Sequence, residues 1–263
     1  MKTNEAPLHR LPCRPSDAWT AEVPHLPGVR GLLLRTVMTF LGPLVSVHGA
    51  ERLVRVPEPA IFALNHNSSF ESIVVPMALI WLRRGRMLHF LIDWMYLRWP
   101  VIGWVMRLSD PIPVYTKPMR WRLGERHRRE RLRQPVPDAC LDRLAAGGSL
   151  GIFPEGRRNR RLDSLLRGRP GLGEIVLRST ASVVPVGIRF PAAERLGRPP
   201  LVGRIVLVIG EPLAFQEERE ERALARVVVA RVMSEISRLS GKAFPAGLRE
   251  PAQRRLAAGG RTS

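Results

Sequence analysis

The stretch from Asn65 to Glu71 holds two side chains whose types and spacing suit proton transfer. It follows the apolar run Ala60–Leu64 and precedes another, so His66 is expected at a turn from a strand into a helix. Open α/β sheets bind ligands at the carboxyl ends of their strands. Glu71 is able to fold back onto one imidazole nitrogen, while the other nitrogen takes a proton from a substrate hydroxyl. The alternative is a structural turn histidine that happens to lie near a glutamate.

A second candidate site is the sequence Phe153-Pro154-Glu155-Gly156, which again follows an apolar run directly. Proline and glycine on either side of the acid predict a rigid turn that holds Glu155 in a set place. The arginines that follow, among them Arg157 and Arg158, are able to clamp an anion. The alternative is a solvated loop in an arginine-rich chain.

Together, these motifs resemble blocks of the glycerolipid acyltransferase family, the lysophosphatidic acid acyltransferase-like enzymes. A histidine followed five residues later by an acid precedes Phe-Pro-Glu-Gly-x-Arg, in the family's order. Two further blocks and a linker also resemble the family: Asp110-Pro111-Ile112-Pro113-Val114-Tyr115, Val183-Val184-Pro185-Val186 and Trp99–Trp104. The resemblance runs from about Asn65 to Gly187.

The resemblance implies an O-acyltransferase of phospholipid biosynthesis. Its donor would be acyl-CoA or acyl carrier protein, and its acceptor the hydroxyl of a lysophospholipid, foremost 1-acylglycerol-3-phosphate. On this model His66 is the general base, Glu71 holds it, and no acyl-enzyme forms. The residues implied in substrate binding are Lys117, Phe153, Pro154, Glu155, Gly156 and Arg158. The thioester is a co-substrate, and neither a cofactor nor a metal is expected.

Three positions depart from the family pattern. Glu71 stands where the family usually has aspartate, and Arg157 stands where a small residue is usual. Thr116 aligns with the arginine that is thought to contact the acceptor phosphate, and the adjacent Lys117 offers only a point charge in its place. Two alternatives therefore stay open: an acyltransferase with a non-glycerolipid acceptor, such as an amino-lipid, and a catalytically weakened relative that binds lipid.

The elements that must position these motifs alternate between strand and helix from Pro59 onward, which predicts one α/β domain over residues 30–245 with a mixed sheet flanked by helices. The predicted strands are Ala60–Leu64, Leu88–Ile92, Ser149–Phe153, Ser182–Phe190 and Arg204–Ile209, with Asp110–Tyr115 at an edge. The predicted helices are Ser72–Leu82, Arg120–Arg133, Ala139–Ala146 and Glu217–Leu239.

Residues 1–29 are expected to form a flexible, proline-rich leader, and residues 246–263 a disordered tail. Between them, residues 31–47 are predicted to form an amphipathic helix, which either packs on the core or lies in a bilayer interface. Its apolar stripe consists of Leu34, Val37, Met38, Leu41, Leu44 and Val45. The charge-free part, residues 36–47, is shorter than the roughly 20 residues that a spanning helix needs. No secretory signal is expected.

The chain carries a formal net charge of +19, from 42 Lys and Arg against 23 Asp and Glu. Such a surface favours nucleic acid, anionic lipid or a phosphorylated ligand, and the alternative is that a genome rich in arginine codons causes much of the bias. No nucleic-acid-binding module is recognisable, so nucleic acid is not expected. We expect an anionic membrane surface as partner, with peripheral or monotopic binding at the cytoplasmic face.

The chain has only two cysteines, Cys13 and Cys140, which excludes a disulfide scaffold.

The segment from Trp81 to Trp121 contains five of the six tryptophans. These side chains either pack in the core or lie at a bilayer interface, which suits an apolar ring with one polar edge. The charged stretch Arg120–Arg133 overlaps this segment. It is either an ordinary solvated helix face or a site for the phosphates of the coenzyme or of headgroups.

Overall fold

The computed structural model describes residues 8–11, 15–98, 103–104, 106–107, 109–115, 125–126, 135–192, 202–215 and 222–244 of the 263. Within them, one eight-stranded sheet runs in the order β1-β2-β8-β7-β3-β6-β4-β5. The strands are β1 (Leu8–Arg10), β2 (Val45–His48), β3 (Ala60–Leu64), β4 (Leu88–Asp93), β5 (Ile112–Val114), β6 (Ser149–Ile152), β7 (Ser182–Arg189) and β8 (Ile205–Ile209). The helices are α1 (Pro15–Thr20), α2 (Gly28–Leu41), α3 (Glu71–Leu82), α6 (Val136–Ala145), α7 (Pro170–Leu177) and α9 (Arg222–Ser240), with short 3-10 turns at Gly42–Leu44, Ala50–Arg55 and Tyr96–Arg98.

The centre of the sheet is parallel. β3 pairs in parallel with β6 and with β7, and β4 pairs in parallel with β6 and with β5. The β7–β8 and β1–β2 pairs are antiparallel, which makes the sheet mixed. β3 and β6 are buried along their whole length because both faces of a parallel sheet are covered. Their carboxyl ends therefore reach the same edge of the sheet.

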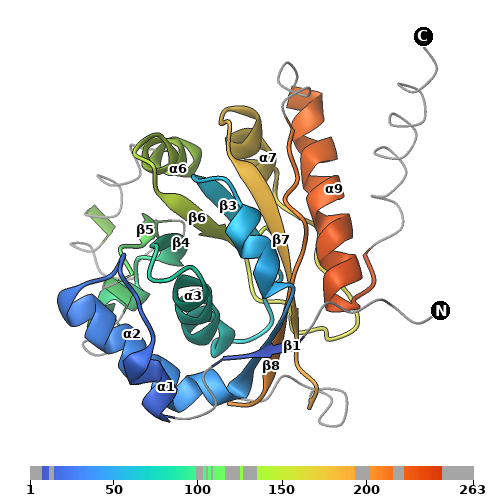
Figure 1. The fold of residues 1–263 in the computed structure, drawn as a ribbon. Coiled ribbons are helices and arrows are strands. Elements are labelled where there is room, and N and C mark those ends of the chain that lie inside the picture. Colours follow the sequence, from blue (N-terminus) through green and yellow to red (C-terminus); the bar gives the residue numbers. More distant parts are fainter. Residues whose placement is uncertain are drawn as a thin grey trace.

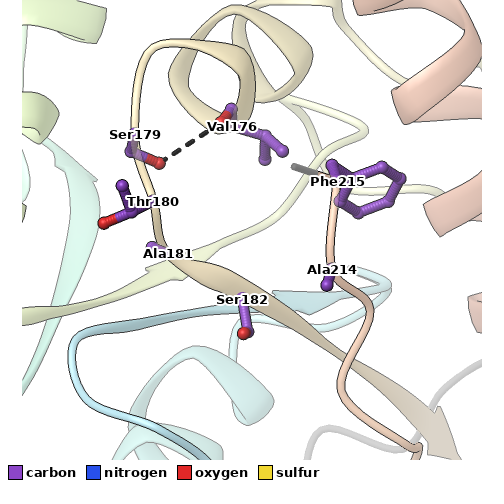
Figure 2. Close-up of a pocket in the computed structure, with 7 residues that line it drawn as sticks. All are labelled: Val176, Ser179, Thr180, Ala181, Ser182, Ala214 and Phe215. Atoms are coloured by element: carbon purple, nitrogen blue, oxygen red, sulfur yellow. Dashed lines mark hydrogen bonds between the residues drawn. The ribbon is translucent and has the colours of Figure 1, made fainter. Parts of the chain in front are cut away.

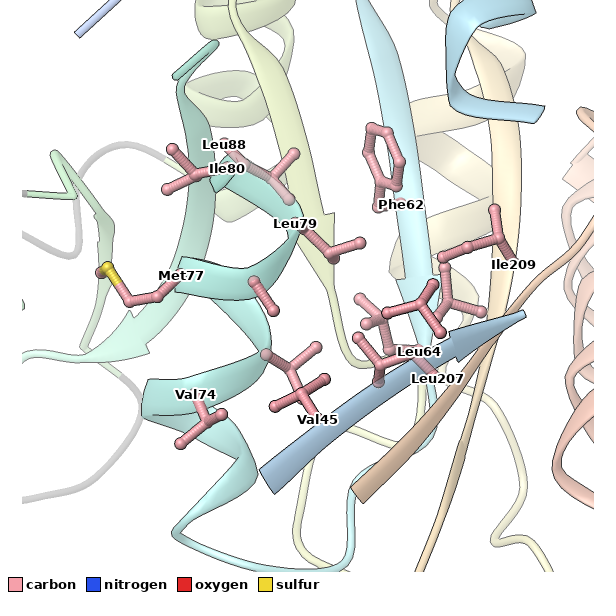
Figure 3. Packing of buried hydrophobic residues seen from close by; sticks show 14 of the residues in the cluster. Val45, Phe62, Leu64, Val74, Met77, Leu79, Ile80, Leu88, Leu207 and Ile209 are labelled. Carbon is pink, nitrogen blue, oxygen red and sulfur yellow. The ribbon is translucent and has the colours of Figure 1, made fainter. Parts of the chain in front are cut away.

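Helices cover both faces of the sheet (Figure 1). On one face, α2 and α3 pack against Phe62 and Leu64 of β3, and Figure 3 shows side chains of α3 such as Val74 and Leu79 in this layer. On the other face, α6, α7 and α9 pack against Ile61 and Ala63 of the same strand. Alternate residues of β3 thus enter opposite cores, as the two-residue period of a strand requires.

The expected mixed α/β sheet flanked by helices is confirmed. Each strand expected from an apolar run is present, with bounds that differ by two residues or fewer at each end, and β5 is an edge strand as expected. Helix α7 was not expected. Arg120–Arg133 lies outside the described residues apart from 125–126, as do 217–221 of the last predicted helix and the 246–263 tail.

The expectation of a flexible leader is wrong for most of residues 8–29. β1 pairs with β2, and α1 packs with α2, burying Ala18. Arg35 of α2 stabilises this packing, because its Nη1 donates to the carbonyls of Ala18, Trp19 and Ala21 at 3.0, 3.1 and 2.7 Å. These carbonyls lie at the end of α1, where backbone acceptors have no partner within the helix. Residues 1–7 and 12–14 lie outside the described residues.

The predicted amphipathic helix of residues 31–47 is too long. α2 ends at Leu41, and Val45–His48 form β2, whose alternate side chains are buried against β8 in parallel pairing. The apolar stripe of α2 packs on the core, where Leu34 and Met38 are buried. A second set of apolar side chains on α2 is exposed, namely Val29, Leu32 and Phe40. Over the part of the chain that the structure describes, the helices are too short or too polar to cross a membrane.

Candidate active site

The two motifs meet at one edge of the sheet because they follow neighbouring parallel strands. His66 lies two residues after β3, and Phe153 follows β6 directly. The backbone N–H of Asn159 donates to the carbonyl of His66 at 2.7 Å, so the two loops are joined. The predicted position of His66 at the carboxyl end of a strand is correct.

His66 and Glu71 form a close pair. The Nδ1 atom of His66 lies 2.6 Å from Oε1 of Glu71, and the glutamate side chain is fully buried. Glu71 is the first residue of α3, where the helix dipole favours a negative charge. Its Oε1 also accepts the backbone N–H of Asn67. With Nδ1 engaged in this way, Nε2 is the ring nitrogen left to exchange a proton with a substrate, and the imidazole is 15% exposed.

A chain of aromatic side chains supports the imidazole. Phe153 stacks on His66 with ring centroids 4.4 Å apart and an interplanar angle of 26°. Phe90 of β4 lies against Phe153, at 5.7 Å between centroids. Gly151 of β6 makes room for Phe90, since a Cβ at that position would lie 2.3 Å from the Phe90 ring. Phe153 is partly buried, and its stacking orients the His66 ring.

Glu155 lies inside the protein, although the resemblance implied that it binds the acceptor. It is 2% exposed, and its two carboxylate oxygens accept the backbone N–H groups of His66 at 3.0 Å and Leu166 at 2.9 Å. Burial raises the pKa of Glu155, and the two backbone hydrogen bonds act against this rise. Glu155 therefore fixes the backbone of the His66 loop through these hydrogen bonds. Pro154 is also buried, and its carbonyl accepts the N–H of Arg169 at 2.8 Å.

Three asparagines that the sequence reasoning missed hold the loops together. Asn65 accepts the N–H of Ile188 at 2.7 Å and donates to its carbonyl at 3.0 Å. Asn67 donates to the carbonyls of Asn159 and Arg161, each at 2.9 Å, and Asn159 donates to the carbonyl of Ser164. All three are buried. The available signal was the placement of asparagine at the end of a strand, where side-chain amides often replace missing backbone partners.

The residues that follow Glu155 are exposed, and one of them contacts the His66 loop. Gly156, Arg157 and Arg158 are exposed, and Arg158 donates to the hydroxyl of Ser69 in the His66 loop. Gly156 has a φ of 67°, which a glycine adopts without strain. Arg158 is thus available to an anion near His66. Lys117 and Thr116 lie outside the described residues.

A recess elsewhere in the described chain lies away from His66. Within the described ranges, no group of three or more His, Cys, Asp or Glu residues is able to hold a metal ion. Figure 2 shows a recess lined by Val176, Ser179, Thr180, Ala181, Ser182, Ala214 and Phe215. Ser182 begins β7 and is paired with Ala60 at the start of β3, so this recess lies at the end of the sheet opposite His66.

The mixed α/β sheet and the histidine–carboxylate pair at its carboxyl edge fit the sequence resemblance to acyltransferases. A model of the Acyltransferase family matches residues 44–189, more than half of the chain. The chain belongs to the acyltransferase family and is an acyltransferase.

A solved structure, the 1-acyl-sn-glycerophosphate (LPA) acyltransferase PlsC from Thermotoga maritima, is similar to this chain. The two share 21% sequence identity with a TM-score of 0.51, over 79% of this chain and 81% of that one. At this identity the likeness shows a common fold. No curated protein matches the sequence.

Proposed function

We propose that this acyltransferase moves a fatty acyl group from acyl-CoA or an acyl carrier protein to the hydroxyl of a lysophospholipid, with 1-acylglycerol-3-phosphate as the acceptor. The observation that carries the proposal is the 2.6 Å contact between Nδ1 of His66 and Glu71, next to exposed arginines. The similar PlsC structure is that of an enzyme with this acceptor.

The chemistry requires one base and good positioning. Nε2 of His66 takes the proton of the acceptor hydroxyl while the hydroxyl oxygen attacks the carbonyl carbon of the thioester. Glu71 stabilises the imidazolium that forms. When the carbon–sulfur bond breaks, the proton passes from the imidazolium to the leaving thiolate. The ester and the free thiol are the products, and no acyl group is attached to the protein at any stage.

Arg158 is the proposed contact for the acceptor phosphate. Its guanidinium is exposed and lies beside Ser69 in the His66 loop, so a phosphate bound there would lie near the base. A planar guanidinium is able to donate two parallel hydrogen bonds to a phosphate, which fixes orientation as well as charge. Lys117 is proposed as a secondary contact. A second candidate function is acyl transfer to an acceptor without phosphate. It is favoured by Thr116, which stands in place of the family arginine.

Membrane association is proposed to be peripheral or monotopic, at the cytoplasmic face. Trp19 of α1 and Val29, Leu32 and Phe40 of α2 are exposed apolar side chains on two helices that pack together. Such residues favour a bilayer interface, and the net charge of +19 favours anionic lipid. Sedimentation with anionic vesicles should decrease in a Leu32→Ser, Phe40→Ser variant, whereas Val54→Ser, which changes an exposed residue on another element, is the matched control.

A thiol-release assay on the purified protein tests the proposed reaction. The donors are acyl-CoA and acyl carrier protein thioesters. The acceptors are 1-acylglycerol-3-phosphate, its dephosphorylated monoacylglycerol, lysophosphatidylcholine and an amino-lipid. The proposal predicts the highest kcat/KM for the phosphate monoester, and a rise in its KM in Arg158→Ala that Arg157→Ala does not reproduce. A preference for an uncharged or amino acceptor, with Arg158→Ala affecting all acceptors equally, would support the second candidate.

A further inference from the structure

Lys242 is a buried lysine at the end of α9. It lies two residues after Ser240, and Gly241, with a φ of 71°, turns the chain back from the helix. Only 6% of Lys242 is exposed. A buried ammonium group is costly unless it is paired, so its position needs an explanation.

The ammonium group of Lys242 reaches the catalytic loop. Its Nζ donates to Oδ1 of Asn67 at 2.6 Å, across 175 residues of sequence. Asn67 is the residue after His66, and its own backbone N–H donates to Glu71. Lys242 is thus joined directly, by one hydrogen bond, to the loop that carries the proposed base.

The backbone around Lys242 is fixed against the loop that follows β6. Ala243 donates its N–H to the carbonyl of Asp163 at 2.7 Å, and its carbonyl accepts the N–H of Leu165 at 2.8 Å. Ser237 of α9 donates its hydroxyl to the carbonyl of Lys242. These bonds hold the backbone of Lys242 in one place relative to the site, and the bond to Asn67 holds its ammonium group.

Three carboxylates act on Lys242. Burial lowers the pKa of Lys242, while the charges of Glu71, Glu155 and Asp163 act against this. Glu71 and Glu155 are 0% and 2% exposed, and no described residue offers a hydrogen bond to Oε2 of Glu71. Two buried like charges near one loop repel each other strongly in a medium of low dielectric constant, and a cation beside both offsets that repulsion.

We propose that Lys242 is a positioning residue of the acyltransferase site, which fixes the His66 loop through Asn67 and balances the buried carboxylates of Glu71 and Glu155. The role in turnover rests on the proposed function, whereas the effect on Glu155 does not. Lys242 touches no substrate. Its role differs from simple anchoring of α9, because it depends on the positive charge.

The charge and the hydrogen bond are separated by three variants. Lys242→Met removes both, Lys242→Gln keeps a donor for Asn67, and Lys242→Arg keeps the charge. Arg238→Met is the control, because Arg238 is an exposed cation on the same helix that pairs with Glu235. Circular dichroism establishes which variants are folded.

The first readout is carbon NMR of the Glu155 carboxyl, without substrate. The charges of Lys242 and His66 lower the pKa of Glu155, so losing Lys242 should raise it further. The midpoint of the Glu155 titration should move to higher pH in Lys242→Met and Lys242→Gln, and stay near wild type in Lys242→Arg and Arg238→Met. An unmoved midpoint in the uncharged variants would overturn the proposal, whether or not the protein transfers acyl groups.

The second readout is the pH profile of kcat/KM. A protonated Glu155 holds the N–H of His66 less firmly, so the acid limb should move to higher pH in the uncharged variants. At the pH of the wild-type acid limb, the loss should reach about tenfold or more, since a hydrogen bond to a charged group is worth at least that factor. Lys242→Arg should restore most of the activity. An equal loss at every pH, without rescue by arginine, would assign Lys242 to folding alone.

The two readouts also separate this proposal from the proposed function. A wild-type protein that is inactive with every acceptor contradicts the proposed function, and the NMR result still decides on Lys242. If Lys242→Met does not fold, Lys242→Gln gives the result. Failure of both to fold would show a purely structural lysine and overturn the proposal.

Discussion

The carboxylate of Glu155 accepts the backbone N–H of His66 at 3.0 Å, so the motif after β6 holds the motif after β3. The second oxygen of Glu155 holds Leu166 in the same way. A glutamate followed by exposed arginines thus points inward and fixes the position of His66. In the proposed reaction, the Phe153-Pro154-Glu155-Gly156 turn positions His66, and Arg158 of the same loop is the proposed contact for the acceptor.

Glu155→Gln should lower acyl transfer without unfolding the protein. A glutamine has one acceptor oxygen, so its NH2 group would face one of the two backbone N–H groups and that hydrogen bond is lost. An unsatisfied buried donor costs roughly 1–3 kcal/mol, so we expect a fall in kcat of about 5- to 150-fold if this cost displaces His66. Glu174→Gln, at an exposed glutamate of α7, is the control.

Wild type and Glu155→Gln should also differ in how the free energy of unfolding depends on pH. Burial raises the pKa of Glu155 in the folded protein, so its contribution to stability is present at low pH and lost as pH rises through that pKa. Urea unfolding at a series of pH values should show this decline in wild type and less of it in Glu155→Gln. Parallel curves would contradict the buried position of the carboxyl group.

Glu71 should be sensitive to the loss of its charge. Glu71→Gln keeps the shape of the side chain but no longer stabilises an imidazolium at His66, so kcat should fall severely. Glu71→Asp keeps the charge and should retain more activity than Glu71→Gln, although its carboxylate has to reach His66 from a shorter side chain. The steady-state rates of both variants check this, and a glutamine variant as active as wild type is incompatible with the role given to Glu71.

The fold was largely predictable because its central strands are short continuous apolar runs. Ala60–Leu64 was predicted residue for residue, since Pro59 and Asn65 end the run on either side. The apolar stripe of α2 continues through Leu44 and Val45, which predicts a helix to residue 47, although Val45–Val47 also alternate like a strand. Pairing with β8, which lies far away in sequence, decides between the two.

Helix α7 was missed because Gly171 and Gly173 disfavour a helix locally. The structure explains Gly173, since a Cβ there would lie 2.1 Å from the backbone carbonyl oxygen of Ala225 in α9. Close packing of the two helices requires glycine at this position. Such a contact between distant segments leaves no periodic pattern in the sequence.

The site was predictable in part. Spacing alone suggested that Glu71 reaches His66, because five residues across a strand-to-helix turn bring the two side chains together. The inward direction of Glu155 depends on backbone N–H groups of another loop, and the contact of Lys242 with Asn67 depends on where α9 ends. Neither follows from local sequence.

Gly151→Ala should destabilise the protein and disturb the site. The added methyl group would lie within 2.3–2.5 Å of the ring of Phe90, which supports Phe153 and through it His66. Overpacking of this kind costs about 1–3 kcal/mol of unfolding free energy. Gly171→Ala is the control, because no atom lies within 4 Å of its added Cβ. Urea unfolding measures both, and an unchanged free energy in Gly151→Ala would show that the strand is free to adjust.

Cys140 should resist thiol reagents in the folded protein. Its side chain is buried in α6, and burial raises the pKa of the thiol to about 12. Only the thiolate reacts, so at neutral pH labelling requires unfolding. In a Cys13→Ser background, the labelling rate should rise with urea in parallel with the loss of helical circular dichroism. Rapid labelling without urea would show that α6 opens locally.

The central claim is that His66, held by Glu71, is the base of an acyl transfer, and His66→Ala tests it most directly. Thiol release from acyl-CoA in the presence of 1-acylglycerol-3-phosphate should fall by about 10²–10⁴-fold, the usual contribution of a general base. The variant should unfold at a urea concentration near that of wild type, and His25→Ala, at an exposed histidine, should keep full activity. A folded His66→Ala protein that keeps more than about a tenth of the wild-type turnover would contradict the account, since a general base contributes far more than that factor.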